Sequence, residues 1–142
     1  EALLIAGKIT GENSYTNIGK EALTFLVKKT FSQNRYMPIG HSNWYKNKKK
    51  RSNFDQQPED PASTVMALAT AYDITQDERY RKLAQVCFTW FLGNNILGLP
   101  LYDHKNGGCY DGLHPDRINL NQGAESLISY LLARLALSKI LD

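Results

Sequence analysis

Four acidic residues lie where long loops are expected to run into helices: Asp55, Asp60, Asp111 and Glu125. Hydrolysis of a glycosidic bond needs two carboxyl groups flanking a sugar, roughly 5–9.5 Å apart. We predict Glu125, paired with Asp111 or Asp55, as the catalytic residues. Each acid also has a structural interpretation, because Asp60 and Glu125 could stabilise a helix N-terminus and Asp111 could form an Asx turn.

Amide and aromatic side chains accompany these acids in both loops. A sugar presents hydroxyl groups around its ring and C–H patches on its faces, so it needs hydrogen-bond partners and flat aromatic surfaces. This combination favours a carbohydrate ligand. The residues predicted to contact it are Trp44, Tyr45, Gln56, Gln57, Asp60, Tyr102, Tyr110, His114, Asn121 and Gln122.

Other ligand chemistries have weaker support in the sequence. His104, Cys109 and His114 are spaced five residues apart, which matches no usual zinc pattern. The segment 103–114 has a glycine at the sixth position of a calcium-loop template but lacks its other acids. We therefore predict no metal ion and no cofactor. His114 could act as a proton shuttle or simply bond the backbone, whereas His41 and His104 are predicted to face solvent.

Charge and composition limit the classes of partner. The 142 residues carry a net charge of +3, and 22% of them are charged, as in an ordinary globular domain. The one basic run, at 46–51, could touch an anionic sugar or a phosphate, but it is typical of a solvated loop tip. Basic residues elsewhere are scattered, so we expect no nucleic-acid partner. No apolar run approaches the ~18 residues that span a bilayer, and the expected compartment is the cytoplasm.

Apolar spacing predicts five helices, at about 1–9, 15–31, 60–74, 77–92 and 121–140. The clearest is 77–92, where Tyr80, Leu83, Ala84 and Cys87 share one face. Its expected N-cap lies in the turn 75–78, and Gly93 is expected to end it. Strands are expected only as short hairpins in the loops, so the predicted fold class is all-α.

Weak internal repeats organise these helices into antiparallel helical hairpins. The segment 9–15 aligns with 74–80 at an offset of 65 residues, and a further helix start recurs at an offset of 62, from 62–65 to 124–127. Each unit reads as helix, turn, helix and long loop. The loops at 32–59 and 93–120 occupy the same place in the repeat, so both should project at the same end of the bundle, where sites are commonly built.

Several motifs resemble one family. They are the runs 54–58, 93–95, 97–103, 107–109, 111–114 and, most specifically, the Asn-Gln-Gly-Ala-Glu-Ser run at 121–126. Together they resemble the helical-toroid domain, similar to six-hairpin glycosidases, of bacterial proteins associated with glycosyltransferases. The resemblance implies an (α/α) barrel with a groove over the N-terminal ends of its inner helices, and a carbohydrate-related role. The chain departs from the family pattern at position 60, where Asp60 stands in place of an expected Glu.

A complete toroid of this kind needs about 12 helices and roughly 350 residues. We therefore expect residues 1–142 to form a single domain that is the C-terminal part of such a toroid, linked to an upstream region. The face that further hairpins would cover is expected to self-associate with a second copy.

Two other functions remain open from the sequence. The chain could be a non-catalytic helical-repeat module that recognises glycan or protein beside a separate transferase domain. It could also be a helical adaptor without any sugar role. The adaptor hypothesis predicts aromatic residues on a helix face, whereas Trp44, Tyr45, Tyr102 and Tyr110 gather in the predicted loops.

Overall fold

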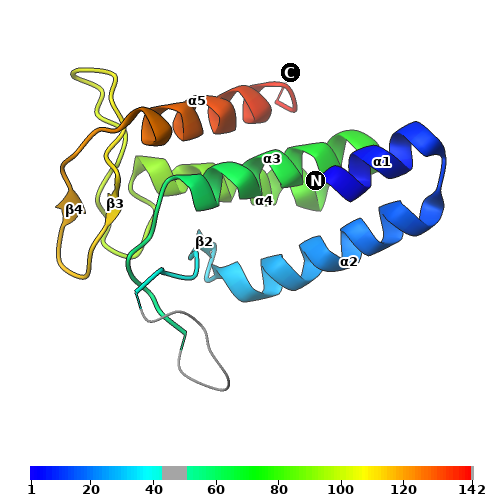
Figure 1. Cartoon of the computed structure of the whole chain (residues 1–142), viewed down its shortest axis with the longest axis horizontal. Helices are drawn as coiled ribbons and strands as arrows, with labels where there is room; N and C mark the ends of the chain where they lie inside the picture. Colours follow the sequence, from blue (N-terminus) through cyan, green and yellow to red (C-terminus); the bar gives the residue numbers. More distant parts are fainter. Residues whose placement is uncertain (43–50, 142) are drawn as a thin grey trace.

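The computed structural model of the chain describes residues 1–42 and 51–141, most of which are helical (Figure 1). The helices, in chain order, are α1 (Ala2–Thr10), α2 (Asn13–Thr30), α3 (Glu59–Thr75), α4 (Glu78–Phe88), the short 3-10 helix η1 (Thr89–Leu92) and α5 (Ala124–Ser138). The prediction of a mainly α-helical chain is confirmed. No helix in the described part is long and apolar enough to cross a membrane.

The helices α1–α2 and α3–α4 form two antiparallel hairpins whose turns repeat in detail. In each turn a threonine hydroxyl donates to the carbonyl four residues earlier, from Thr10 to Ala6 and from Thr75 to Ala71. The next residue, Gly11 or Gln76, adopts a left-handed conformation and ends the first helix. These positions lie 65 residues apart, so the predicted repeat is confirmed at its turns.

The structure corrects two predicted helix boundaries. The last helix begins at Ala124 rather than 121, because residues 118–121 are still paired with the preceding segment. Its start therefore lies 65 residues after that of α3, and the offset of 62 was wrong. The predicted helix at 77–92 ends as α4 at Phe88 and continues as η1, with Asp77 as the N-cap and Gly93 as the stop.

The core forms around α3, which packs against α1, α4 and α5. Its buried residues include Val65 and Leu68 from α3 and Trp90 and Phe91 from η1. Phe91 lies edge-on to Tyr130 of α5, with ring centroids 5.5 Å apart. Cys87 is also fully buried, as predicted for a small core residue.

Both long connections leave the helices at the same end, on the left in Figure 1, as predicted. The first contains the two-residue strands β1 (Phe31–Ser32) and β2 (Arg35–Tyr36), and the second contains β3 (Gly112–Leu113) and β4 (Ile118–Asn119). Each pair is antiparallel. The expectation of short loop hairpins is therefore confirmed.

Candidate functional site

The two long loops are joined by backbone hydrogen bonds. Gln56 and Leu113 exchange two N–H···O bonds of 3.0 and 2.9 Å, so residues 55–57 form a third segment beside β3 and β4. The close approach requires Gly112, because a Cβ atom there would collide with the Gln56 carbonyl oxygen. This small ribbon holds both loops in a fixed relation to the helix ends.

Alternation along the ribbon divides its side chains between two faces. Gln56 and Leu113 are buried against the core, where Trp90 Nε1 donates to Gln56 Oε1 at 2.8 Å and Gln56 Nε2 donates to the Asn53 carbonyl. With only 1% of its surface exposed, Gln56 is a structural residue, which corrects its prediction as a ligand contact. Pairing puts Asp55, Gln57, His114 and Asn119 on the opposite face.

A polar hollow of about 330 Å³ opens where the ribbon meets the N-terminal ends of α3 and α5. Three acids line it, Glu59, Asp111 and Glu125, together with the amides of Gln57 and Asn119. The rest of its lining is Pro58, Gly123, Ala124 and Ser126. We refer to these nine residues as the polar hollow.

Asp111 connects the second loop to the start of α5. Its Oδ1 atom accepts a hydrogen bond from the Gly123 backbone N–H at 2.7 Å and another from the Ser126 hydroxyl at 2.5 Å. It therefore acts as the N-terminal cap of α5 from 13 residues before the helix starts, which is different from the Asx turn considered above. The cap fixes one carboxylate at the wall of the hollow.

Glu59 and Glu125 each stand in the first turn of a helix, α3 and α5 respectively. The positive end of a helix dipole stabilises a carboxylate there. Ser63 Oγ donates to Glu59 Oε1 at 2.8 Å, whereas the Glu125 carboxylate has no hydrogen bond or ion pair among the described residues. Glu125 is therefore the acid most available to a ligand, and the structure does not use it as a cap.

Asp55 lies beside the hollow but is paired with a histidine. Its Oδ1 atom is 2.6 Å from His114 Nδ1, and the two side chains are 43% and 34% exposed. The contact joins the first loop to the second. An aspartate in this position selects the tautomer and orientation of the imidazole, leaving Nε2 on the solvent side of the pair.

Asp60 turns away from the polar hollow towards the first loop. Its Oδ2 atom is buried and lies 3.4 Å from His41 Nε2, while its backbone carbonyl accepts from the Tyr36 hydroxyl. Burial raises the pKa of the Asp60 carboxyl, and the His41 imidazole opposes this shift. The Pro-Glu-Asp-Pro run at 58–61 thus presents Glu59, not Asp60, to the hollow.

The aromatic residues of the second loop lie in a separate turn beside α5. The Tyr102 ring stacks on Tyr130 with centroids 4.1 Å apart, and the Tyr110 hydroxyl donates to Asp103 at 3.0 Å. Gln122 accepts from Asn106 at 3.0 Å across the same turn. None of Tyr102, Tyr110 and Gln122 lines the polar hollow, so the structure does not bring these three to the acids.

The remaining predicted residues are easily placed. Trp44 and Tyr45 lie outside the described residues. Asn121 is exposed just before α5, and its carbonyl accepts from the Asp111 N–H at 2.9 Å. His41 and His104 are exposed, as predicted. Within the described ranges, no three His, Cys, Asp or Glu side chains gather as a metal site.

Sequence reasoning missed Glu59, Asn119 and Ser126 as parts of the hollow. A signal for Glu59 was present, because an acid directly after a loop proline and before the first helical turn is placed like Glu125. Asn119 and Ser126 become neighbours of Glu125 only through the pairing of β3 with β4 and the Asp111 cap. Models of known protein families and curated proteins give no match to this chain.

Proposed function

We propose that the chain is a carbohydrate-active domain whose sugar-binding site is the polar hollow at the N-terminal ends of α3 and α5. The observation that carries the proposal is the meeting of three acids, Glu59, Asp111 and Glu125, with two amides, Gln57 and Asn119, in one open hollow. Carboxylates and amides offer donors and acceptors in the pattern that vicinal hydroxyl groups require.

The three carboxylates have different freedom and therefore different roles. Asp111 is held by Gly123 and Ser126, so it orients the site and accepts from a sugar hydroxyl with its other oxygen. Glu125 has no internal partner and is the acid that acts on the substrate. Glu59, held on one side by Ser63, is the second acid across the hollow. Such a pair meets the minimum that glycoside cleavage or transfer demands.

Asp55 has a supporting role in this proposal. Its pair with His114 places an imidazole next to the hollow, on the ribbon face that also bears Gln57 and Asn119. Asp55 was predicted as a direct catalytic acid, and we now propose that it positions His114.

The arrangement of helices supports part of an (α/α) toroid as the architecture. The two hairpins repeat at 65 residues, α1 and α5 both pack against α3, and the long loops all leave at one end. A site over helix N-termini agrees with the groove implied by the resemblance to six-hairpin glycosidase-like domains of bacterial glycosyltransferase proteins.

A second function is favoured by one specific observation. Asp111, one of the three acids, already serves as the cap of α5. A site with one structural acid and few catalytic ones also suits a module that recognises a glycan without changing it, beside a separate transferase domain. The two functions differ in whether a product is released.

The test is calorimetric titration with a panel of monosaccharides, oligosaccharides and nucleotide sugars, each followed by chromatography of the mixture. We expect one of the sugars to bind the parent chain and to be converted. Glu125→Gln should retain the fold and lose conversion, and Glu59→Gln should behave in the same way. The matched control is Glu12→Gln, an exposed acid in the turn before α2, at the end of the bundle far from the hollow.

Each outcome decides between the functions. Binding by all variants without any product supports the recognition module. Conversion that survives in both Glu125→Gln and Glu59→Gln contradicts their assigned roles. Absence of heat from every sugar with the folded parent chain contradicts the carbohydrate proposal itself.

A further inference from the structure

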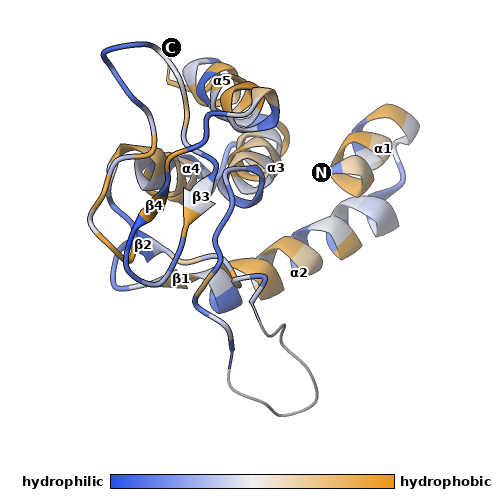
Figure 2. Cartoon of the chain, turned by 60° about the vertical axis from the view of Figure 1, so that its left-hand side comes forward, coloured by the Kyte–Doolittle hydropathy of each residue, from blue (hydrophilic) through white to orange (hydrophobic). Residues whose placement is uncertain are grey.

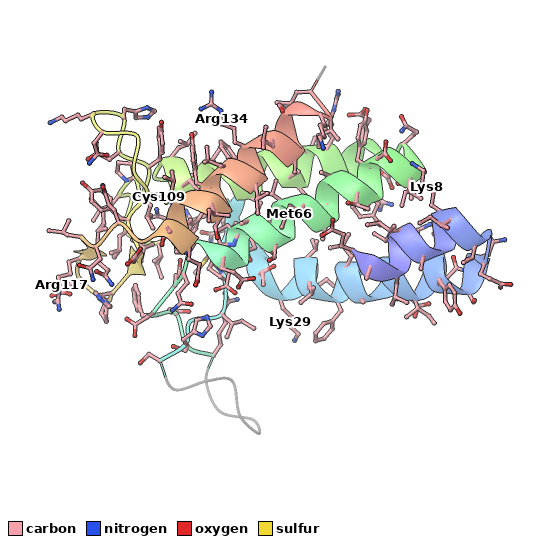
Figure 3. All side chains as sticks on the ribbon, turned by 45° about the horizontal axis from the view of Figure 1, so that its top comes forward. Lys8, Lys29, Met66, Cys109, Arg117 and Arg134 are labelled. Atoms are coloured by element: carbon pink, nitrogen blue, oxygen red, sulfur yellow. The ribbon has the colours of Figure 1, made fainter. Side chains whose placement is uncertain are left out.

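A second hollow, larger than the first and mainly apolar, runs between α1 and α5 with α3 as its floor. Its volume is about 570 Å³. Ile5 lies on one wall, Met66 and Ala69 on the floor, and Leu132, Leu135 and Ala136 on the other wall. Figure 2 shows α1 and α5 standing on opposite sides of α3, and Figure 3 places Met66 on the helix between them. We call this feature the apolar groove.

The wall formed by α5 continues outwards as an apolar ridge. Ile128, Leu131 and Leu135 follow one another at helical spacing and are 54%, 44% and 58% exposed. Residues this apolar are rarely so exposed in a row on a monomer, and contiguous patches of this kind mark protein contacts. The ridge therefore lies directly beside the groove on the same surface.

The rim of the groove is electrically balanced. It carries two acids, Glu1 and Asp73, and two bases, Lys8 and Lys139. Lys8 and Asp73 already form an ion pair of 2.7 Å. A second surface of the same composition can approach without a net charge of like sign opposing it.

We propose that the occupant of the apolar groove is a second copy of this chain. A ridge next to a groove is self-complementary under a twofold axis, because the α5 ridge of each copy enters the groove of the other. Charge balance on the rim permits this approach, and burial of the ridge removes the exposed leucines from water. This interface lies along the helices and is separate from the polar hollow, so it does not depend on the proposed sugar binding.

The test measures molar mass by light scattering during size-exclusion chromatography, with protein from about 1 to about 100 µM, a range in which weak dimers dissociate. We expect the parent chain to be a dimer at the upper concentration. Leu135→Glu and the double variant Ile128→Glu with Leu131→Glu should be monomers there. Circular dichroism confirms that each variant keeps its helices.

The matched control is Leu120→Glu, which introduces the same charge at an exposed leucine in the second loop, outside the groove and its ridge. It should remain a dimer. A monomeric parent chain at every concentration overturns the proposal. So does a dimer that survives in folded Leu135→Glu, because the contact then lies elsewhere, for example on the exposed α2 stripe of Ile18, Phe25 and Leu26.

Discussion

The two hollows of this molecule are built in opposite ways. The apolar groove is lined by three helices whose side chains follow the helical period, from Ile5 through Met66 to Leu135. The polar hollow is lined by residues from two loops and two helix ends, which are brought together by backbone pairing at Gln56 and Leu113. The first depends on local periodicity, whereas the second depends on a few long-range contacts.

This difference has an energetic consequence. Removing one exposed side chain from the groove leaves α1, α3 and α5 in place, because their packing rests on other residues. Removing a buried tie such as Gln56 leaves polar partners without hydrogen bonds and releases the loops. The polar hollow should therefore be the more fragile of the two regions, and four predictions test this comparison.

The largest effect is expected for Gln56→Ala. The variant leaves the buried Trp90 Nε1–H and the Asn53 carbonyl without the amide partner, and it opens a void behind the ribbon. The free energy of unfolding should fall by about 2–3 kcal/mol. Urea unfolding followed by circular dichroism measures it. Gln57→Ala, on the exposed neighbour, should change it by less than about 0.5 kcal/mol; equal losses in the two variants would contradict the asymmetry.

The next effect is expected for Asp111→Ala. The Gly123 N–H and the Ser126 hydroxyl lose their acceptor, so the first turn of α5 loses its cap. Stability should fall by about 1–2 kcal/mol. Hydrogen exchange should quicken at residues 123–127 before it quickens in α3. Unchanged exchange at the start of α5 would show that the cap is not needed.

A smaller, pH-dependent effect is expected from Asp60. Because burial raises the pKa of its carboxyl above the ordinary 3.8, the folded state binds this proton more tightly than the unfolded state. Stability should therefore fall as the pH rises from 3.8 through the raised pKa. In Asp60→Asn this decrease should be absent, as unfolding measured at several pH values between about 3.5 and 6 will show. A variant with the parent's pH slope would assign that slope to another group.

The smallest effect on the folded monomer is expected for Leu135→Glu. The side chain is more than half exposed, so in dilute solution, where the chain is a monomer, stability should change by less than about 0.5 kcal/mol. Thermal unfolding at low concentration gives the value. A loss as large as that of Gln56→Ala would make the groove as dependent on single residues as the hollow.

The helices could be predicted well because their information is local. Apolar spacing, the Asp77 cap and the Gly93 stop placed α4 and η1 together within one residue of the end that they reach, although not the change to a 3-10 helix at Thr89. The repeat at 65 residues also followed from local turn chemistry around Thr10 and Thr75.

The site could be predicted only in part. Sequence reasoning identified Gln57, Asp111 and Glu125 because they stand at or near loop-to-helix junctions. It could not tell that Gln56 turns inwards while Gln57 turns outwards, since the face is set by pairing with Leu113, 57 residues away. Likewise, nothing local to Asp60 indicated that it would turn to His41 while Glu59 faces the hollow.

The central claim is that the polar hollow, and not the apolar groove, binds a sugar. The most direct test is a series of ¹H–¹⁵N spectra of the labelled chain, recorded while the sugar that binds in calorimetry is added. We predict that amide shifts gather at Gln57, Glu59, Asn119 and the segment 123–126, while Met66 and the rest of the groove stay unchanged. Shifts confined to the groove, or no saturable shift from any sugar, would contradict the claim.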